Sequence, residues 1–235
     1  VIFSARHAYF EQVEAAIRFW EKQRQSAPVT LLEATRLALG TEQVHDLPVD
    51  EVQAEGWLAE WLERLKEPQR LSELPPPRSL RGELRPYQRV GFSWLAFFRR
   101  YGLGACLADD MGLGKTIQTL ALLLYEKEQY GQFPAPVLLV CPTSVVTNWQ
   151  REAERFAPSL RLLIHQRPNR LRDEAFRQAA QAADMVVTSY ALLRQDQALL
   201  ESLEWFGVIL DEAQNIKNPS ARQSQAARRL KAQFR

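Results

Sequence analysis

The sequence contains few of the residues that build metal clusters and disulfide frameworks. Among its 235 residues there are two cysteines, Cys106 and Cys141, and three histidines. The cysteines lie inside apolar runs without C-x-x-C spacing, and the histidines are scattered along the chain. The sequence therefore predicts neither a zinc site nor a disulfide framework, and we expect both cysteines to be core residues.

Long apolar runs are also missing. The longest, such as residues 137–141, are far shorter than the ~20 residues that a membrane-spanning helix needs. The chain does not open with a basic segment followed by an apolar one. We therefore expect a cytoplasmic protein without a membrane partner, associated with the nucleoid if the source is bacterial. Apolar residues make up 46% and charged residues 25%, which is typical of a folded protein.

Charge is distributed unevenly along the chain. Residues 1–80 carry nine Lys/Arg against thirteen Asp/Glu, whereas residues 81–235 carry 21 against 15. No acidic residue follows Glu212, but six basic ones do: Lys217, Arg222, Arg228, Arg229, Lys231 and Arg235. Such a stretch suits contact with phosphates, although a solvated helix face would carry the same charges.

The first 80 residues predict a helical N-terminal region. Apolar residues recur at three- and four-residue spacing over 8–23 and again over 50–66, which favours two amphipathic helices. The run Leu74-Pro75-Pro76-Pro77 cannot continue a helix, so it indicates a linker near residue 75. We assign residues 1–80 to this region and its linker, and residues 81–235 to a second domain.

The second domain has the rhythm of an α/β fold. Residues 87–100 are helical in pattern, and short apolar runs then alternate with longer helical patterns. This alternation predicts a parallel sheet covered by helices on both faces. The candidate strands, each bounded by Gly, Pro or polar residues, are 103–108, 136–141, 160–164, 184–188 and 206–210.

A phosphate-binding loop follows the first candidate strand. Residues 109–116 read DDMGLGKT and lead directly into the apolar helical stretch 117–124. Glycines let the backbone close around phosphates, and the new helix directs its amide groups at them. Lys115 would supply charge to the β- and γ-phosphates, and Thr116 a hydroxyl to Mg²⁺. The strict P-loop pattern begins with Gly where this chain has Asp109, and a glycine-rich turn is the simpler alternative.

Two adjacent carboxylates end the last candidate strand. Residues 211–214 read DEAQ, at the carboxyl edge of a parallel sheet, where α/β folds bind ligands. Asp211 would hold Mg²⁺, and Glu212 would act as general base on the attacking water. Alone, such a pair is more often a helix N-cap with an acid in the first turn. Together with Lys115 and Thr116, it favours the catalytic interpretation.

These blocks resemble superfamily 2 helicases and, within them, the Snf2 group. Residues 84–88, LRPYQ, look like the adenine-reading Q motif. Residues 109–116 resemble the family P-loop with Asp110 in place of Glu, and 211–214 resemble its DExx box with Gln214, a coupling residue, in place of His. The residues that the resemblance assigns to ATP binding are Arg85, Tyr87, Gln88, Asp110, Met111, Gly112, Leu113, Gly114, Lys115 and Thr116.

Two further blocks resemble the family segments that contact a DNA backbone. Residues 140–149 are similar to motif Ia and residues 187–190 to motif Ib, while 215–220 continue from the DExx box in the Snf2 manner. Hydroxyls and loop amides suit phosphate contact, although each block is equally typical of an ordinary turn or helix cap. The residues expected at DNA are Pro142, Thr143, Ser144, Thr188 and Ser189.

The resemblance implies the first RecA-like lobe of an ATP-dependent motor that moves along double-stranded DNA. Motif III, a second RecA-like lobe and its arginine fingers would follow Arg235, and Val1 is not an initiator methionine, so we expect both ends to continue. Alone, this lobe should hydrolyse ATP poorly. The resemblance leaves open whether the motor remodels DNA-bound protein, recycles RNA polymerase or acts in repair.

Two other functions compete with this interpretation. The chain could be a nucleotide-gated binding module without turnover, which the intact Lys115, Asp211 and Glu212 argue against. It could also be an unrelated P-loop enzyme acting on a small molecule, which would need neither the Q motif nor the basic C-terminal stretch.

Overall fold

The computed structural model describes residues 2–4, 51–53, 59, 73–110, 112–166, 168 and 170–234. The chain divides into two compact units, Val1–Leu71 and Ser72–Arg235. In the first unit, strands β1 (Ile2–Ser4) and β2 (Glu51–Gln53) pair antiparallel. The helix predicted over 50–66 is therefore wrong at residues 51–53, where one apolar residue between two polar ones suits a strand. The helix predicted over 8–23 lies outside the described residues, and a helical region over 1–80 stays a prediction.

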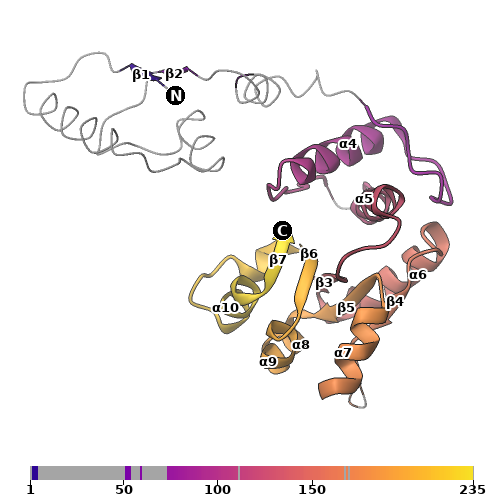
Figure 1. Ribbon diagram of the computed structural model, residues 1–235, viewed down its shortest axis with the longest axis vertical. Helices are drawn as coiled ribbons and strands as arrows, with labels where there is room; N and C mark the ends of the chain where they lie inside the picture. Colours follow the sequence, from indigo (N-terminus) through magenta and orange to yellow (C-terminus); the bar gives the residue numbers. More distant parts are fainter. Residues whose placement is uncertain are drawn as a thin grey trace, which may run out of the picture. The chain divides into compact units, whose positions relative to one another are not determined.

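The second unit is built on a parallel sheet, as predicted (Figure 1). Its strand order is β4-β5-β3-β6-β7, and each neighbouring pair is parallel. Four of the predicted strands are confirmed, with small shifts at their ends. The strands are β3 (Val137–Cys141), β4 (Leu162–Ile164), β5 (Met185–Ser189), β6 (Glu204–Leu210) and β7 (Lys231–Phe234).

The strand expected over residues 103–108 is wrong, because this segment joins no sheet. Its sequence, LGACLA, contains no β-branched or aromatic residue, the types that favour strands. Cys106 is exposed there, contrary to our expectation of a core residue, whereas Cys141 is buried in β3 as expected. Strand β7 is not predicted by the sequence pattern, because it is only four residues long.

Helices cover both faces of the sheet, as predicted. Along β3, Val137, Leu139 and Cys141 face one core with α5 and α6, while Leu138 and Val140 face the other with α7, α8 and α10. No helix among the described residues is long and apolar enough to cross a membrane. The helices are α4 (Pro86–Arg100), α5 (Lys115–Tyr130), α6 (Val146–Phe156), α7 (Asp173–Ala182), α8 (Tyr190–Gln195), α9 (Gln197–Glu201) and α10 (Arg222–Arg229), with short 3₁₀ turns η2 (Thr143–Val145) and η3 (Ala213–Ile216).

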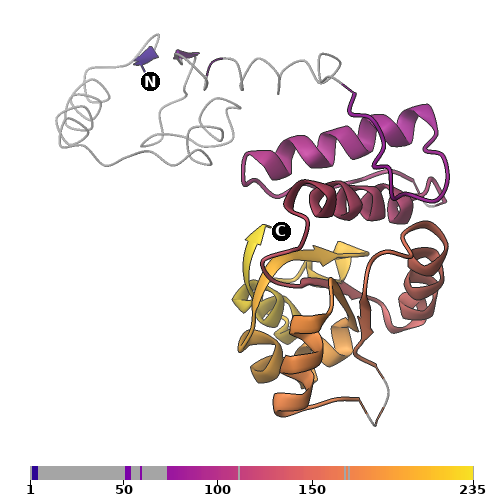
Figure 2. The same ribbon diagram turned by 45° about the vertical axis from the view of Figure 1, so that its right-hand side comes forward.

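Helices α4 and α5 lie side by side over a small core of their own (Figure 2). The proline-rich segment belongs to this layer, because Leu74 and Leu80 pack against it. The backbone N–H of Leu74 also donates to Ser93 Oγ at 2.9 Å. Residues 74–80 are therefore packed on the second unit, although we expected a linker there.

An arginine connects this helical layer to the sheet. The guanidinium of Arg99 in α4 lies 4.7 Å from the ring centre of Phe206 and 4.5 Å from that of Phe234. Gly207 makes room for this stack, since a Cβ on it would lie 2.1 Å from the Phe234 ring. Strands β6 and β7 thus hold the helix that carries the predicted Q motif.

Candidate nucleotide site

The Q-motif residues contact the P-loop directly. Gln88 lies in the first turn of α4 and is buried, and its side-chain oxygen accepts from the backbone N–H of Arg85 at 2.9 Å. The amide nitrogen of the same side chain donates to the carbonyl of Leu113 at 3.0 Å, and the Tyr87 hydroxyl donates to it at 3.2 Å. One side chain therefore joins the start of α4 to the loop before α5.

The loop has the backbone conformations that glycine allows. Gly112 and Gly114 have φ of 83° and 78°, in the left-handed region. At Gly114 a side chain is disfavoured both by this backbone conformation and by space, because a Cβ would lie 2.5 Å from the amide nitrogen of Gln88. The loop ends at Lys115, the first residue of the 16-residue helix α5, and Thr116 follows it in the first turn. Met111 lies outside the described residues.

Polar contacts inside the loop involve Lys115 and Asp109. The ammonium of Lys115 donates to the carbonyl of Asp109 at 2.6 Å and to that of Asp110 at 3.0 Å. The carboxylate of Asp109 accepts from the side-chain amide of Gln118 at 3.0 Å. Gln118 is fully buried in α5, and the sequence analysis missed it although it interrupts an apolar helix. Asp109, the departure from the strict pattern, is thus anchored by a partner within the motif's own helix.

Asp211 lies at the carboxyl edge of the sheet, directly after β6. Its backbone N–H donates to the carbonyl of Val140 in β3 at 2.9 Å. Its side-chain Oδ2 accepts from the indole Nε1 of Trp149 at 2.8 Å, and its carbonyl accepts from the Tyr190 hydroxyl at 2.8 Å. We did not predict a role for Trp149 or Tyr190, although both stand in the blocks that resemble motifs Ia and Ib.

The charge of Asp211 contributes to the raised pKa of two buried groups. Burial, followed by Asp211, raises the pKa of the Cys141 thiol to about 12. Burial and then Asp211 also raise the pKa of the Tyr190 hydroxyl, with smaller contributions from Cys141 and Glu212. Both groups therefore stay protonated and neutral beside the carboxylate.

Glu212 has a strained backbone. Its φ of 53° and ψ of 53° lie in the left-handed region, which costs a residue other than glycine about 1–3 kcal/mol. Its carboxylate accepts from the side-chain amide of Gln214, and its carbonyl accepts from Asn215 Nδ2 at 2.8 Å. Its side chain makes no capping bond to η3, so the helix-cap alternative gains no support.

The candidate DNA-contact residues differ in exposure. Thr143 and Ser144 are exposed in η2, and Pro142 is half-buried just before it. Thr188 and Ser189 are buried. The Thr188 hydroxyl donates to the carbonyl of His165 at 3.2 Å, and Ser189 Oγ caps α8 by accepting from the N–H of Leu192. The fold already uses these last two hydroxyls, and a DNA contact through them stays a prediction.

The basic stretch forms an exposed surface on and around α10. Lys217, Arg222, Arg229 and Lys231 are exposed, as is Arg228, which has a partner within the chain. Ser224 ties the helix back to η3, donating to the carbonyl of Ile216 at 3.0 Å. The exposed positive charges thus follow directly on the DEAQ segment.

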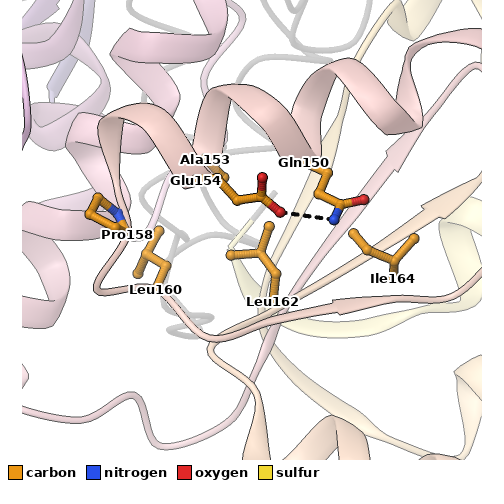
Figure 3. A pocket seen from close by; sticks show the side chains of 7 residues that line it. All are labelled: Gln150, Ala153, Glu154, Pro158, Leu160, Leu162 and Ile164. Carbon is orange, nitrogen blue, oxygen red and sulfur yellow. Dashed lines mark hydrogen bonds between the residues drawn. The ribbon is translucent and has the colours of Figure 1, made fainter.

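A separate groove lies between α6 and the edge strand β4 (Figure 3). It has a volume of about 310 Å³ and a floor of Leu160, Leu162 and Ile164, with Gln150 and Glu154 hydrogen-bonded above it at 2.9 Å. None of the predicted site residues lines it. This groove is therefore separate from the candidate nucleotide site.

A metal at this site would need oxygens from outside the protein. No cluster of three or more His, Cys, Asp or Glu suited to a metal occurs in the described part of the chain. Mg²⁺ typically takes one or two protein oxygens, several waters and the phosphates of its substrate. Thr116 offers one hydroxyl and Asp211 one carboxylate, which are oxygen donors of the kind that this mode of binding uses.

Comparison with known proteins identifies the family. Residues 87–235 match the family model described as the SNF2-related domain. The chain belongs to this family. It is 48% identical over 170 residues to YwqA of Bacillus subtilis, whose name describes an ATP-dependent helicase/translocase, and 43% identical over 151 residues to helicase SWR1 of Saccharomyces cerevisiae. These matches cover 72% and 62% of this chain but only 18% and 10% of those relatives.

Solved structures of SNF2-related proteins have the same fold. The SWI2/SNF2 ATPase core of Sulfolobus solfataricus in complex with double-stranded DNA is 39% identical, with a TM-score of 0.61. The match covers 70% of this chain and 33% of that one. The predicted Snf2 resemblance and RecA-like fold are therefore confirmed, and this SNF2-related chain spans a minor part of the relatives that it matches.

The two cysteines test the surroundings of Asp211. Because the pKa of Cys141 is about 12 and its thiol is buried, it should not react with a disulfide reagent near neutral pH, whereas the exposed Cys106 should. We expect one thiol of the two to react in the native protein and both in denaturant, measured by absorbance of the released thiolate. Substitution Cys106→Ser should abolish the native reaction. Two fast-reacting thiols in the native protein would contradict the described environment of Cys141.

Proposed function

We propose that this chain is the ATP-binding first lobe of a Snf2-type motor that binds Mg-ATP and moves along double-stranded DNA. The observation that carries the proposal is the hydrogen bond from the Gln88 amide to the Leu113 carbonyl. It joins a segment that resembles an adenine-reading motif to a glycine-rich loop that leads into α5. A family match over residues 87–235 supports the same assignment.

In the proposed site, Lys115 and the first turn of α5 bind the phosphates. The ammonium is a point charge at the start of a long helix, where backbone amides and the helix dipole also favour anions. Tyr87 and Gln88 would contact the adenine from the start of α4. Thr116 and Asp211 would hold Mg²⁺, which when bound neutralises charge on the β- and γ-phosphates.

Glu212 is the proposed general base. Phosphoryl transfer needs a water that is oriented and polarised beside the γ-phosphate. The left-handed backbone of Glu212 turns the chain directly after the strand, and the amide of Gln214 donates to its carboxylate. Gln214 therefore contacts the base itself, in keeping with the coupling role that we propose for it.

The proposed DNA contact uses those of the predicted DNA-contact residues that are not buried. Pro142, Thr143 and Ser144 at η2 would meet one backbone segment, and the positive charges around α10 another. Thr188 and Ser189 would hold the loop in shape. Such contacts to phosphates carry no base sequence. A second RecA-like lobe would supply further contacts and the arginine fingers, and the identity of any DNA-bound protein or polymerase partner stays open.

The two competing functions would not require two features of this chain, the Gln88 bridge and the strained backbone of Glu212. An unrelated P-loop enzyme acting on a small molecule would not need Gln88 to bridge α4 and the loop, nor a basic surface after the acidic box. A nucleotide-gated module without turnover would not need Glu212 in a strained conformation. Both features are present in this chain, and they favour the motor.

Nucleotide binding is the first test of the proposal. Substitution Lys115→Ala removes a charge-assisted contact to phosphate, which typically contributes at least ~1.5 kcal/mol, or about tenfold in affinity. Calorimetry with Mg-ADP should therefore show at least that loss. The control Arg177→Ala removes one positive charge from the half-buried, ion-paired Arg177 of α7 and should leave the affinity unchanged. Equal affinities for Lys115→Ala and the unsubstituted chain would refute the loop assignment.

DNA binding should be weak, independent of sequence and sensitive to salt. We expect Kd values near the non-specific range of ~10⁻⁴–10⁻⁶ M, weakening steeply as salt increases, because phosphate contacts release counterions. Fluorescence anisotropy with random duplex, single-stranded DNA and RNA at two salt concentrations measures this. The paired reversal of Arg228 and Arg229 to Glu should weaken binding to every sequence alike.

The control for that experiment is the same change of charge on another helix. Reversal of Arg172 and Arg177 to Glu, at and in α7, alters the net charge equally and should have a much smaller effect. If both pairs weaken binding equally, only net charge matters, and the basic stretch is a solvated helix face. Binding that does not depend on salt would remove the phosphate-contact argument.

A further inference from the structure

The carboxylate of Asp211 has one direct protein partner among the hydrogen bonds of the described residues. The indole N–H of Trp149 donates to Oδ2 at 2.8 Å, and no donor from the described part of the chain reaches Oδ1. An indole nitrogen can only donate, so it binds the carboxylate oxygen without competing for the metal. The pair is a charge-assisted bond, which is shorter and stronger than a neutral one.

Trp149 is itself held rigidly. It is 3% exposed, stands in α6 and packs in the core that α5 and α6 form on the sheet. Tyr190, from the core on the other face of the sheet, bonds the backbone carbonyl of Asp211. The two donors thus hold Asp211 at its side chain and at its backbone, from elements that follow β3, the strand beside β6, and β5, the next one along.

We infer that Trp149 is the positioning residue of the metal-binding carboxylate. Its N–H holds Oδ2 so that Oδ1 is the oxygen presented to Mg²⁺ with the nucleotide. This inference rests on the proposed function, because it assumes that Asp211 binds Mg²⁺. Groups that hydrogen-bond to a metal ligand orient it and tune its basicity, and their loss typically lowers metal affinity or activity about 10–100-fold.

The chain contains a matched indole for comparison. Trp205 in β6 is 1% exposed, and its Nε1 donates to the backbone carbonyl of Leu200 at 2.9 Å. Trp149 and Trp205 are thus both buried and both hydrogen-bonded, but only one has a carboxylate as acceptor. A Phe in either place removes the N–H and part of the ring, so the two substitutions cost similar packing.

The first experiment tests whether the metal binds beside the Trp149 indole. With ¹⁵N-labelled tryptophan, the six indoles of the chain give six N–H resonances. ADP with Mn²⁺ in place of Mg²⁺ should broaden one of them far more than the rest, because the paramagnetic ion would bind beside the Trp149 N–H. That resonance should be the one missing from Trp149→Phe. Absence of selective broadening in a protein that binds Mn-ADP would overturn the inference.

The second experiment separates positioning from stability. A fluorescent ADP analogue is titrated with and without Mg²⁺ against the unsubstituted chain, Trp149→Phe and Trp205→Phe, each checked by its melting temperature. We expect Trp149→Phe to raise the Mg²⁺ concentration for half-maximal effect about tenfold while metal-free ADP binds as before. Trp205→Phe should leave both quantities unchanged.

The outcomes distinguish the inference from the proposed function beneath it. If the unsubstituted chain binds no ADP, or binds it without any effect of Mg²⁺, the proposed function fails. If it shows a normal Mg²⁺ dependence that Trp149→Phe leaves unchanged, the proposed function stands and the inference is wrong. If Trp149→Phe does not fold, the Trp149 resonance is assigned by elimination, through Phe substitutions at the other five tryptophans, and its selective broadening in the unsubstituted protein then decides.

Discussion

The parallel register of β3 with β5 and β6 is the constraint on which the site depends. Val140 pairs with Thr188 on one side and Leu210 on the other, so the three strands end at the same edge. The bond from the Asp211 N–H to Val140 extends this register by one residue beyond the ladder. In a parallel sheet the carboxyl ends of all strands lie at one edge, where loops that are far apart in the sequence meet. Trp149 and Tyr190, which are 41 residues apart in the sequence, thereby contact the same acidic residue.

The loop before α5 is attached to this sheet through packing and through one ion pair. Arg99 of α4 lies against two aromatic rings of β6 and β7, and its Nε is 3.2 Å from the carboxylate of Glu126 in α5. Burial raises the pKa of Glu126, and the charge of Arg99 opposes that shift. A pair of this kind is strongly destabilising to break but contributes little net stability when intact. Its role is to fix how α4 and α5 lie on the strand that leads to Asp211.

The sequence predicts those elements whose pattern of residues is visible within a short stretch of the chain. The glycines of the loop, the apolar runs of β3, β5 and β6, and the helix at residues 87–100 follow from composition and periodicity. It failed where tertiary contacts decide: residues 103–108 are apolar but have no strand partner, and β7 is short and depends on pairing with β6. Thr188 carries the right chemistry for DNA but is buried, and Trp149 was noticed only as part of a motif. Hydrogen-bond partners far apart in sequence cannot be found by spacing.

The central claim is that the P-loop and Asp211 form one Mg-ATP site. A crystal structure with Mg²⁺ and a non-hydrolysable ATP analogue tests it most directly. The account predicts that the β- and γ-phosphates lie against Lys115 and the first turn of α5, with one metal between Thr116 and Asp211 Oδ1 and the Trp149 bond to Oδ2 retained. A nucleotide bound elsewhere, or a metal bound at the phosphates without Asp211, would contradict it.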